Sequence, residues 1–435
     1  MTMTDQAAFP ARPGQMMLLL ASPTFLIFVS SNFVNVGNLA YNMIFSRLIG
    51  PELFGDLAAV LTVKLAVLGV LNALQLAVSQ RVAASSPGAD PAGLERILAR
   101  LNVLSFWGLA VALQLVLFAI FAGDLSARIG LSSPWLLAIV MISLPVTAPL
   151  AILRGVVLGR LHVSAVILSS NLEMLIRLIG GLLAWEAGAG IVGVAATIPL
   201  SIVAAWMVLR RELPVAPDFG VASRRAGRAL LLAALPFAVL QMSQVVLLDG
   251  DVLTAKTLLG ATDAGYSAAL ALFQRIQFFG CFGIAAVLLP SVAAAVASGE
   301  SALRSALPVA IAFVLVSVPF MAGISLCPEL LLRVLVGPAF VDAAPILWIA
   351  GTCAAAFTLS YLLATFLAGL GDRAGIWLIV AAMPVQVFMI VRASHDPAFA
   401  LQTLLDIKLW VQLSLAALVS ARCVWTLVRR ARAAA

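Results

Sequence analysis

ALLLAALPFAVLQMSQVVLLDGDVLTAK, residues 229–256, is an apolar run long enough to cross a lipid bilayer, yet it carries two aspartates near its end. A transmembrane helix needs about 20 predominantly apolar residues to span the hydrocarbon layer. Runs of this kind recur from one end of the chain to the other. The sequence therefore predicts an all-α, polytopic integral membrane protein. It also raises the question of what Asp249 and Asp251 do inside a span.

The composition supports this prediction. Hydrophobic residues make up 63% of the 435 residues, charged residues only 10%, and the mean hydropathy is +1.12. A soluble domain is about half apolar and about a quarter charged. The four cysteines are scattered without a CxxC pair, and His162 and His395 stand far apart. We therefore expect no metal site, no cofactor and no catalytic centre, and interpret the cysteines as ordinary small apolar residues.

Twelve apolar runs are long enough to be membrane spans. They divide into two sets of six around a longer basic segment, 211–228. We expect an N-terminal lobe at 1–210, a cytoplasmic linker at 211–228 and a C-terminal lobe at 229–435. The predicted spans are 20–46, 54–84, 97–122, 134–160, 162–186, 189–210, 229–256, 265–297, 303–327, 341–369, 373–394 and 398–427.

The distribution of basic residues predicts the orientation. With the N-terminus in the cytoplasm, most of the 26 Lys and Arg residues fall on cytoplasmic ends and loops, as the positive-inside rule requires. The C-terminus is then cytoplasmic too. Residues 1–15 show no cleavable signal peptide, so the first apolar run is expected to remain as a span. The net charge of +7 is explained by topology and indicates no nucleic-acid partner.

A weak internal repeat agrees with the division into halves. SRLIGPELFG (46–55) aligns without gaps with KTLLGATDAG (256–265), which pairs Gly50 with Gly260 and Gly55 with Gly265. Both segments follow the first span of their half. The pattern is typical of a parallel repeat, whose symmetry axis lies along the membrane normal.

Four basic residues fall inside spans, where no loop can account for them. Each costs roughly 2.5–3.5 kcal/mol at a helix centre, so such residues usually face a polar interior. All four lie at a similar depth on the predicted boundaries, two in each half. We therefore expect one shared, hydrated, positively charged cavity near the midplane, formed by Lys64, Arg177, Arg275 and Lys408.

Polar side chains accompany these cations. Asn35, Asn38 and Asn42 share one face of the first span, and Gln75 shares a face with Lys64 at helical spacing. They are candidates to line the cavity, although asparagines at such positions can equally join helices through hydrogen bonds.

Three carboxylates lie in the same spans. Asp251 falls on a polar stripe, whereas Asp249 points away and is assigned to a helix contact or to the headgroup boundary. Glu173 stands four residues before Arg177, so the two could neutralise each other. Lys64 and Arg275 have no such partner on their own helices and are the best candidates for ligand contact.

A cavity lined by cations and amides suits an anionic, hydroxyl-rich cargo such as a sugar diphosphate. The chain contains no GxxxxGK[ST] phosphate-binding loop, so ATP hydrolysis is not built in. Transport would then be coupled to an ion gradient or to the membrane potential. Asp251 and Glu173 are the candidate carriers of a coupling proton or sodium ion.

Several segments together resemble a known family. In order they are RLIGPELFGDLAAV (47–60), ILRGVVLGRLHVSA (152–165), NLEMLIRLIGGLL (171–183), GIVGVAATIPLS (190–201), DVLTAKTLLGATDAGYSAALALF (251–273), LLPSV (288–292) and VLVGPAFVDAAPILW (334–348). The chain resembles the polysaccharide-transporter branch of the multidrug/oligosaccharidyl-lipid/polysaccharide exporter superfamily over nearly its whole length.

The resemblance implies two six-helix lobes arranged as a V around a central cationic cavity. It implies a flippase that moves polyprenyl-diphosphate-linked oligosaccharide units across a bacterial inner membrane, with membrane lipids and a polysaccharide polymerase as further partners. The four buried cations match the family's cavity cations in kind, although not at a fixed motif position.

Two other functions remain in view. A multidrug exporter of the same superfamily would usually present acids to its cavity, whereas this chain presents bases. A polysaccharide polymerase or ligase would be expected to carry a large extracytoplasmic loop, and the predicted loops here are short.

Overall fold

The computed structural model describes residues 23–84, 91–213 and 216–434, and these are helical with no β-strand among them. The N-terminal stretch 1–15, for which the sequence predicts no cleavable signal peptide, lies outside the described residues. The long helices are α2 (Pro23–Ala83), α3 (Pro91–Phe121), α6 (Leu144–Gly159), α7 (Val163–Glu186), α8 (Gly190–Leu209), α9 (Val221–Leu258), α10 (Ala261–Ala297), α11 (Ala302–Leu326), α13 (Ala344–Gly369), α14 (Ala374–Ala393) and α15 (Leu401–Ala434). Shorter helices are α4 (Leu125–Ile129), α5 (Pro134–Met141), α12 (Pro328–Leu335) and the 3₁₀ helix η1 (Pro338–Ala343).

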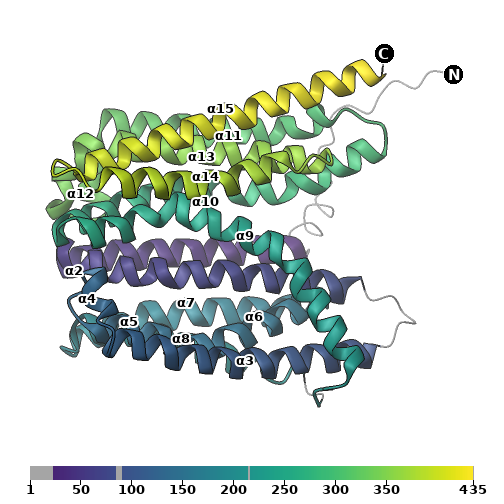
Figure 1. Cartoon of the computed structure of the whole chain (residues 1–435), viewed down its shortest axis with the longest axis horizontal. Helices are drawn as coiled ribbons and strands as arrows, with labels where there is room; N and C mark the ends of the chain where they lie inside the picture. The colour runs from purple at the N-terminus through teal and green to yellow at the C-terminus, as the bar shows by residue number, and fades with distance from the viewer. Residues whose placement is uncertain (1–22, 85–90, 214–215, 435) are drawn as a thin grey trace, which may run out of the picture.

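Helix α2 contains the first two predicted spans. It reverses at Gly50, whose φ of 73° lies in the left-handed region that favours glycine, and Pro51 follows directly. Figure 1 shows the two halves of α2 lying alongside each other. The predicted loop at 47–53 is therefore a sharp turn centred on one residue.

Ten helical segments among the described residues are long and apolar enough to cross a membrane. The first of them, Val29–Ala83, contains the two spans that meet at Gly50, and α10 provides a further long helix of 37 residues. The prediction of a polytopic all-α membrane protein is confirmed, and the helices accommodate the twelve predicted spans.

Two predicted segments differ in detail from the structure. The predicted span 134–160 coincides with the apolar segment Pro134–Gly159, but a break within it separates α5 from α6. Pro145 lacks a backbone N–H and so weakens helical hydrogen bonding at this point. Helix α9 begins at Val221, inside the segment predicted as linker. Its buried positions Ser223, Gly227 and Leu230 recur at helical spacing, and a side chain at Gly227 would meet Leu101 of α3.

The helices form two bundles that run along the long axis of the molecule (Figure 1). Where the bundles meet, α2 packs against both α9 and α10. The core of the N-terminal half is packed from α2, α3, α5, α6 and α8 together with Leu230 and Ala234 of α9. The core of the C-terminal half is packed mainly from α9, α10, α13 and α15, together with Phe54 and Ala58 of α2. Large apolar side chains such as Phe118, Leu315 and Phe388 are exposed on the outside, as expected where lipid replaces water.

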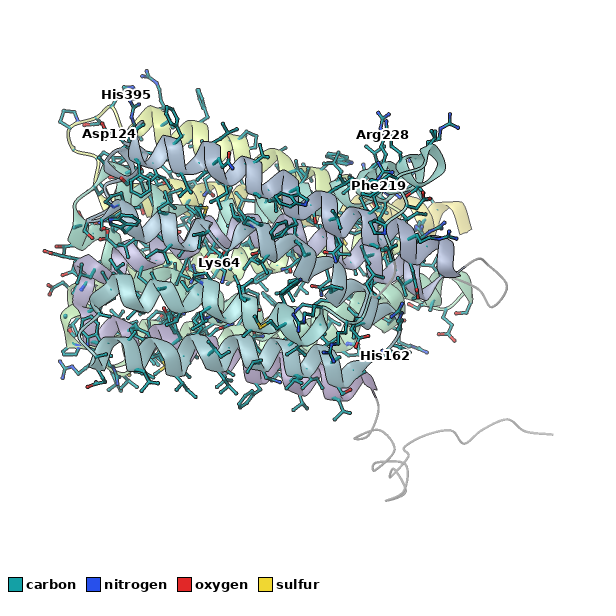
Figure 2. The ribbon with its side chains drawn as sticks, turned by 90° about the horizontal axis from the view of Figure 1, so that it is seen from below. Lys64, Asp124, His162, Phe219, Arg228 and His395 are labelled. Atoms are coloured by element: carbon teal, nitrogen blue, oxygen red, sulfur yellow. The ribbon has the colours of Figure 1, made fainter. Side chains whose placement is uncertain are left out.

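The two ends of the molecule are distinguished in Figure 2. One end carries Asp124 and His395, and is called the Asp124 end. The opposite end carries His162, Phe219 and Arg228, and is called the Arg228 end. Lys64 lies between them, at mid-length of the helices.

Candidate functional site

The four cations of the predicted cavity form two groups, one in each half of the chain; Lys64 and Lys408 are buried, and Arg177 and Arg275 are partly buried. Lys64 and Arg177 belong to the first, together with Arg154 and Glu173; this group is called the Lys64 cluster. Arg275 and Lys408 belong to the second, together with Asp249 and Asp251; this group is called the Lys408 cluster. The sequence predicts one shared group of four cations. The structure instead gives each half its own set of partners.

Lys64 is the exceptional member of the first cluster. It lies on the second half of α2 and is only 4% exposed. Its Nζ makes no hydrogen bond with any described residue. Its charged neighbours are Arg177, Glu173 and Arg154. A buried ammonium without a partner is costly, so this position is ready to accept an anion.

Glu173 of α7 pairs with Arg154 of α6, with 2.8 Å between Oε2 and Nη2. The Arg154 guanidinium also donates to Ser169 Oγ, at 3.3 Å from Nε and 3.1 Å from Nη2. The salt bridge of Glu173 is therefore with Arg154, and not with Arg177, with which it could have paired on its own helix. The sequence does not distinguish Arg154 from other basic residues, because it lies near the predicted cytoplasmic end of its span, where the positive-inside rule accounts for a positive charge.

Arg177 is held against the first half of α2. It donates to Asn38 Oδ1, and its guanidinium lies 5.6 Å from the centroid of the Tyr41 ring. The backbone carbonyl of Asn38 accepts from Asn42 Nδ2 at 2.7 Å. Asn38 thus joins α2 to α7 through a hydrogen bond, which is one of the two roles that the sequence left open.

The Lys64 cluster carries a positive excess. Three basic side chains face a single carboxylate, and that carboxylate is already paired with Arg154. In the low-polarity interior such an excess attracts anions strongly, because charges are poorly screened there.

Lys408 is in the opposite situation. Its side chain is 1% exposed, and Nζ donates to three acceptors: Asp251 Oδ2 at 2.9 Å, Gln274 Oε1 at 2.6 Å and the Leu248 carbonyl at 2.8 Å. Gln274 Nε2 also donates to Asp251 Oδ2, at 3.1 Å. Every proton of the ammonium group therefore has an acceptor.

Arg275 is paired as well. Its Nε donates to Asp249 Oδ1 at 2.6 Å, between α10 and α9. Its Nη2 is buried without a hydrogen-bond partner among the described residues. The aspartates of residues 245–256 thus neutralise two different cations. Asp249 lies at a helix contact, as its orientation predicts, and Asp251 does so too.

The remaining predicted residues lie apart from these ion pairs. Asn35 lines a pocket between α2 and α7. Gln75 lies where α2 packs on α6, and its carbonyl is next to Gly155. Among the described residues, no three His, Cys, Asp or Glu side chains gather as ligands of a metal would.

At the Asp124 end the two halves are joined by polar contacts. Lys256 Nζ lies 2.5 Å from Asp56 Oδ1, and both side chains are almost fully buried. Asp56 Oδ2 accepts from the backbone N–H of Ser132 at 3.2 Å. Ser46 Oγ donates to the Val336 carbonyl at 2.9 Å. These contacts close this end of the molecule between the halves.

Small residues allow that closure. A Cβ placed on Gly55 would lie 2.9 Å from the backbone nitrogen of Gly265, and one placed on Gly265 would collide with the Pro51 carbonyl. These two glycines are the pair aligned by the internal repeat. The repeat therefore meets itself at the junction of the halves.

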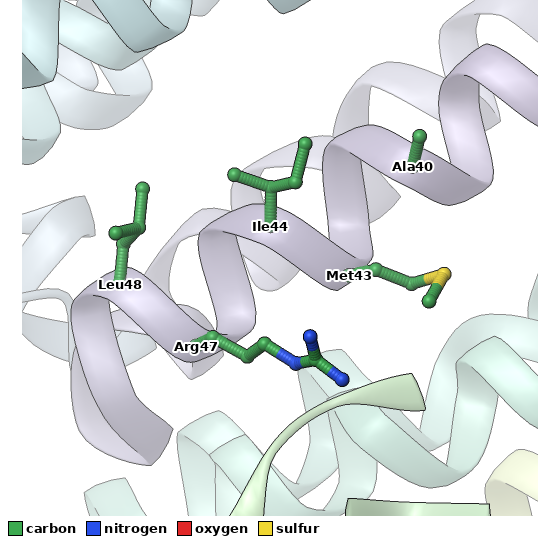
Figure 3. Close-up of a pocket in the computed structure, with 5 residues that line it drawn as sticks. All are labelled: Ala40, Met43, Ile44, Arg47 and Leu48. Carbon is green, nitrogen blue, oxygen red and sulfur yellow. The ribbon is translucent and has the colours of Figure 1, made fainter. Parts of the chain in front are cut away.

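A shallow apolar pocket lies nearby on α2. Its volume is about 280 Å³, and Figure 3 shows the residues that line it: Ala40, Met43, Ile44, Arg47 and Leu48. Arg47 is engaged elsewhere, because its guanidinium donates to the carbonyls of Arg333 and Val334 in α12. This pocket offers no free polar group to a ligand.

The fold matches solved transporters over nearly the full chain. An inward-facing multidrug-resistance MATE-family transporter of the MOP superfamily is 17% identical, with a TM-score of 0.78 over 92% of this chain and 96% of that one. An outward-facing MATE-family transporter, also 17% identical, gives 0.60 over 97% and 96%. A MOP-superfamily transporter from Pyrococcus furiosus, 15% identical and described as having a binding pocket of reversed polarity, gives 0.62 over 96% of both chains.

The structural similarity establishes the fold alone, which is an all-helical, multi-pass membrane fold like that of the MATE transporters. No curated protein sequence matches the chain. The model of the polysaccharide biosynthesis protein family matches residues 20–296, which is more than half of the chain. The chain therefore belongs to that family, and the resemblance seen in the sequence is confirmed.

Proposed function

We propose that this member of the polysaccharide biosynthesis protein family is a flippase for polyprenyl-diphosphate-linked oligosaccharide units in the bacterial inner membrane. The observation that carries the proposal is the Lys64 cluster, with its positive excess and its unpartnered, buried ammonium group. A diphosphate supplies the missing negative charge. Membership of the family supplies the class of cargo.

The cluster suits a diphosphate because its basic side chains differ in how many hydrogen-bond partners they already have. Arg154 is committed to Glu173 and Ser169, and Arg177 is oriented by Asn38 and Tyr41. Lys64 has no partner to give up. A phosphate oxygen that reaches Lys64 therefore gains a charge-assisted hydrogen bond, while Arg177 is already oriented to contribute another.

The coupling site is proposed from the carboxylates. Asp251 holds Lys408, and Glu173 holds Arg154. Protonation of either carboxylate, or its capture by a sodium ion, would release a cation into the interior and change the charge that the cargo meets. Either event would link cargo movement to an ion gradient.

In this proposal the Asp124 end faces the periplasm and the Arg228 end faces the cytoplasm, with both termini on the cytoplasmic side. Exposed Arg224, Arg225 and Arg228 support this orientation, because basic residues are enriched on the cytoplasmic side. The contacts between Asp56 and Lys256 then close the periplasmic exit while the site is loaded from the cytoplasm. The proposal also places a polymerase, which receives the exported unit, as a neighbour in the membrane.

Drug export is the second candidate, since structural neighbours include multidrug transporters. The sign of the charge argues against it, because an organic cation would be repelled by three basic groups with one carboxylate among them.

The proposal is tested in a strain that lacks the protein. Lipid-linked sugars are measured in spheroplasts with a probe that cannot cross the membrane, which reports the leaflet that holds them. We expect repeat units to accumulate on the inner face and wild-type protein to restore export. Lys64→Met should not restore it, whereas the matched control Val36→Ala, on the exposed face of the same helix, should. A normal leaflet distribution in the deletion strain would refute glycan flipping.

A further inference from the structure

A second pocket, of about 200 Å³, lies between the first half of α2 and the start of α7. Its polar lining consists of Ser30, Ser31, Asn35 and Ser170, and its apolar lining of Val34, Val166 and Ile167. No charged residue lines it. An uncharged pocket that combines hydroxyl and amide groups with a few apolar side chains does not suit an ion or a hydrocarbon chain.

The pocket continues the face that carries the cations. Ser170 precedes Arg177 by seven residues, so both lie on one face of α7, separated by about 10 Å at 1.5 Å per residue. Asn35 and Asn38 are likewise close on one face of α2. The two helices are joined on this side by the hydrogen bond from Arg177 to Asn38 and by one of 2.9 Å from Asn171 Nδ2 to Ser30 Oγ.

Several polar side chains in this pocket are unpaired. The side chains of Ser31, Asn35 and Ser170 form no hydrogen bond with any described residue; those of Ser31 and Asn35 are exposed, and that of Ser170 is partly buried. Asn171 Oδ1, next to the pocket, is buried without a partner. Unpaired polar groups within a membrane protein are costly unless water or a ligand satisfies them. Hydroxyls and amides offer both donors and acceptors, and so does a sugar.

We infer that this pocket is a sugar subsite, which holds the sugar nearest the diphosphate while the diphosphate occupies the Lys64 cluster. The apolar side chains contact the C–H face of the sugar ring, and Ser31, Asn35 and Ser170 bind its hydroxyls. The inference rests on the proposed function. It adds that the N-terminal half binds a sugar of the glycan directly, in addition to the negatively charged diphosphate that links the glycan to the lipid.

The test measures binding to purified protein in nanodiscs of phosphatidylethanolamine. The probes are farnesyl diphosphate and its glucosyl, galactosyl and N-acetylglucosaminyl derivatives. The quantity of interest is the ratio of the Kd without sugar to the Kd with the sugar that binds best. The subsite variant is Asn35→Leu with Ser170→Ala. The matched control replaces one exposed residue on each helix, Val36→Ala with Leu168→Ala.

For the wild type and the control we expect the sugar to tighten binding by about tenfold, the gain from one or two net hydrogen bonds. The subsite variant should lose this gain and bind farnesyl diphosphate as the wild type does. Loss of affinity for all probes alike would indicate a structural role and overturn the subsite. A full sugar gain in the variant, or no gain in the wild type, would overturn it as well.

Lys64→Met separates this inference from the proposed function. It should weaken binding of every probe while leaving the sugar gain intact. If Lys64→Met weakens the binding of no probe, the proposed diphosphate site at the Lys64 cluster is refuted. The sugar gain in the wild type and the subsite variant still tests the sugar subsite independently. A further arm adds phosphatidylglycerol, whose headgroup also carries hydroxyls. If the wild type binds phosphatidylglycerol more tightly than the subsite variant does and shows no sugar gain, the pocket is assigned to that lipid and the sugar is overturned.

Discussion

The Lys64 cluster and the Lys408 cluster occupy corresponding halves of one fold, but they treat buried charge in opposite ways. In the second, two cations face two carboxylates, and Lys408 has three acceptors. In the first, three cations face one carboxylate, and Lys64 has no acceptor. A self-neutralised cluster holds helices together, whereas a cluster with excess charge has capacity for a ligand. Counting buried cations alone does not separate these roles.

The largest effect on folding is expected from Asp251→Leu. It leaves the Lys408 ammonium buried and uncompensated, and breaking a buried pair in this way costs about 3–5 kcal/mol. The free energy of unfolding in detergent should fall accordingly. Asp251→Leu combined with Lys408→Met should recover most of the loss, because no lone charge remains. A double variant no more stable than the single one would contradict the comparison.

The second-largest effect on stability is expected from breaking the Lys256–Asp56 salt bridge at the junction of the halves. Lys256→Met removes the salt-bridge partner of buried Asp56, which keeps only the Ser132 N–H, and breaking a buried pair of this kind costs about 3 kcal/mol. Closure at the Asp124 end should weaken. Spin labels at Asp124 and His395, on a background in which exposed Cys327 is replaced by Ser, should report a longer distance. An unchanged distance distribution would exclude this pair as a latch.

Lys64→Met should have a small effect on stability and of the opposite sign. It removes a buried charge that has no partner, so unfolding should become no easier, with a change within about 1 kcal/mol or a gain. Export should nevertheless be lost. Thermal unfolding and the spheroplast assay are measured on the same variant. Strong destabilisation would mean that Lys64 has a partner in the folded protein. The proposed contrast between an unpaired Lys64 and a fully paired Lys408 would then be wrong.

The smallest effect is expected at the Arg228 end, where Arg422 Nε and Thr426 Oγ1 each donate to Asp372 Oδ2 at 2.8 Å. Partial burial opposes ionisation of Asp372. The bonds from Arg422, Thr426 and the Ala374 N–H outweigh it and hold the pKa of Asp372 below its ordinary value. The folded state therefore gains stability above the ordinary Asp pKa, and loses it as the pH falls through the lowered pKa.

Arg422→Gln should cost about 1 kcal/mol or less at neutral pH, because the pair is partly exposed to solvent. The difference from wild type should disappear in acid, once Asp372 is protonated in both proteins. Unfolding curves recorded across the acid range check this. A difference that persists below the lowered pKa would show that Arg422 contributes by packing.

The sequence by itself determined the class of fold. Apolar runs of membrane length follow from the backbone's need to satisfy its hydrogen bonds in lipid, and this local requirement is visible in any stretch of about 20 residues. The sequence also marked Gly55 and Gly265 as equivalent, and it identified the four cations as unusual. These are properties of single helices.

Only the tertiary structure decided how the charges are paired. Glu173 forms its salt bridge with Arg154 of α6 instead of Arg177 on its own helix. Asp251 forms its salt bridge with Lys408, which is distant in the sequence. Such choices depend on how α6, α9 and α15 are placed beside their neighbours, and helical spacing contains no information about the facing helix. For the same reason the sequence cannot show that Lys64 lacks a hydrogen-bond partner, because a partner could come from any helix packed against it.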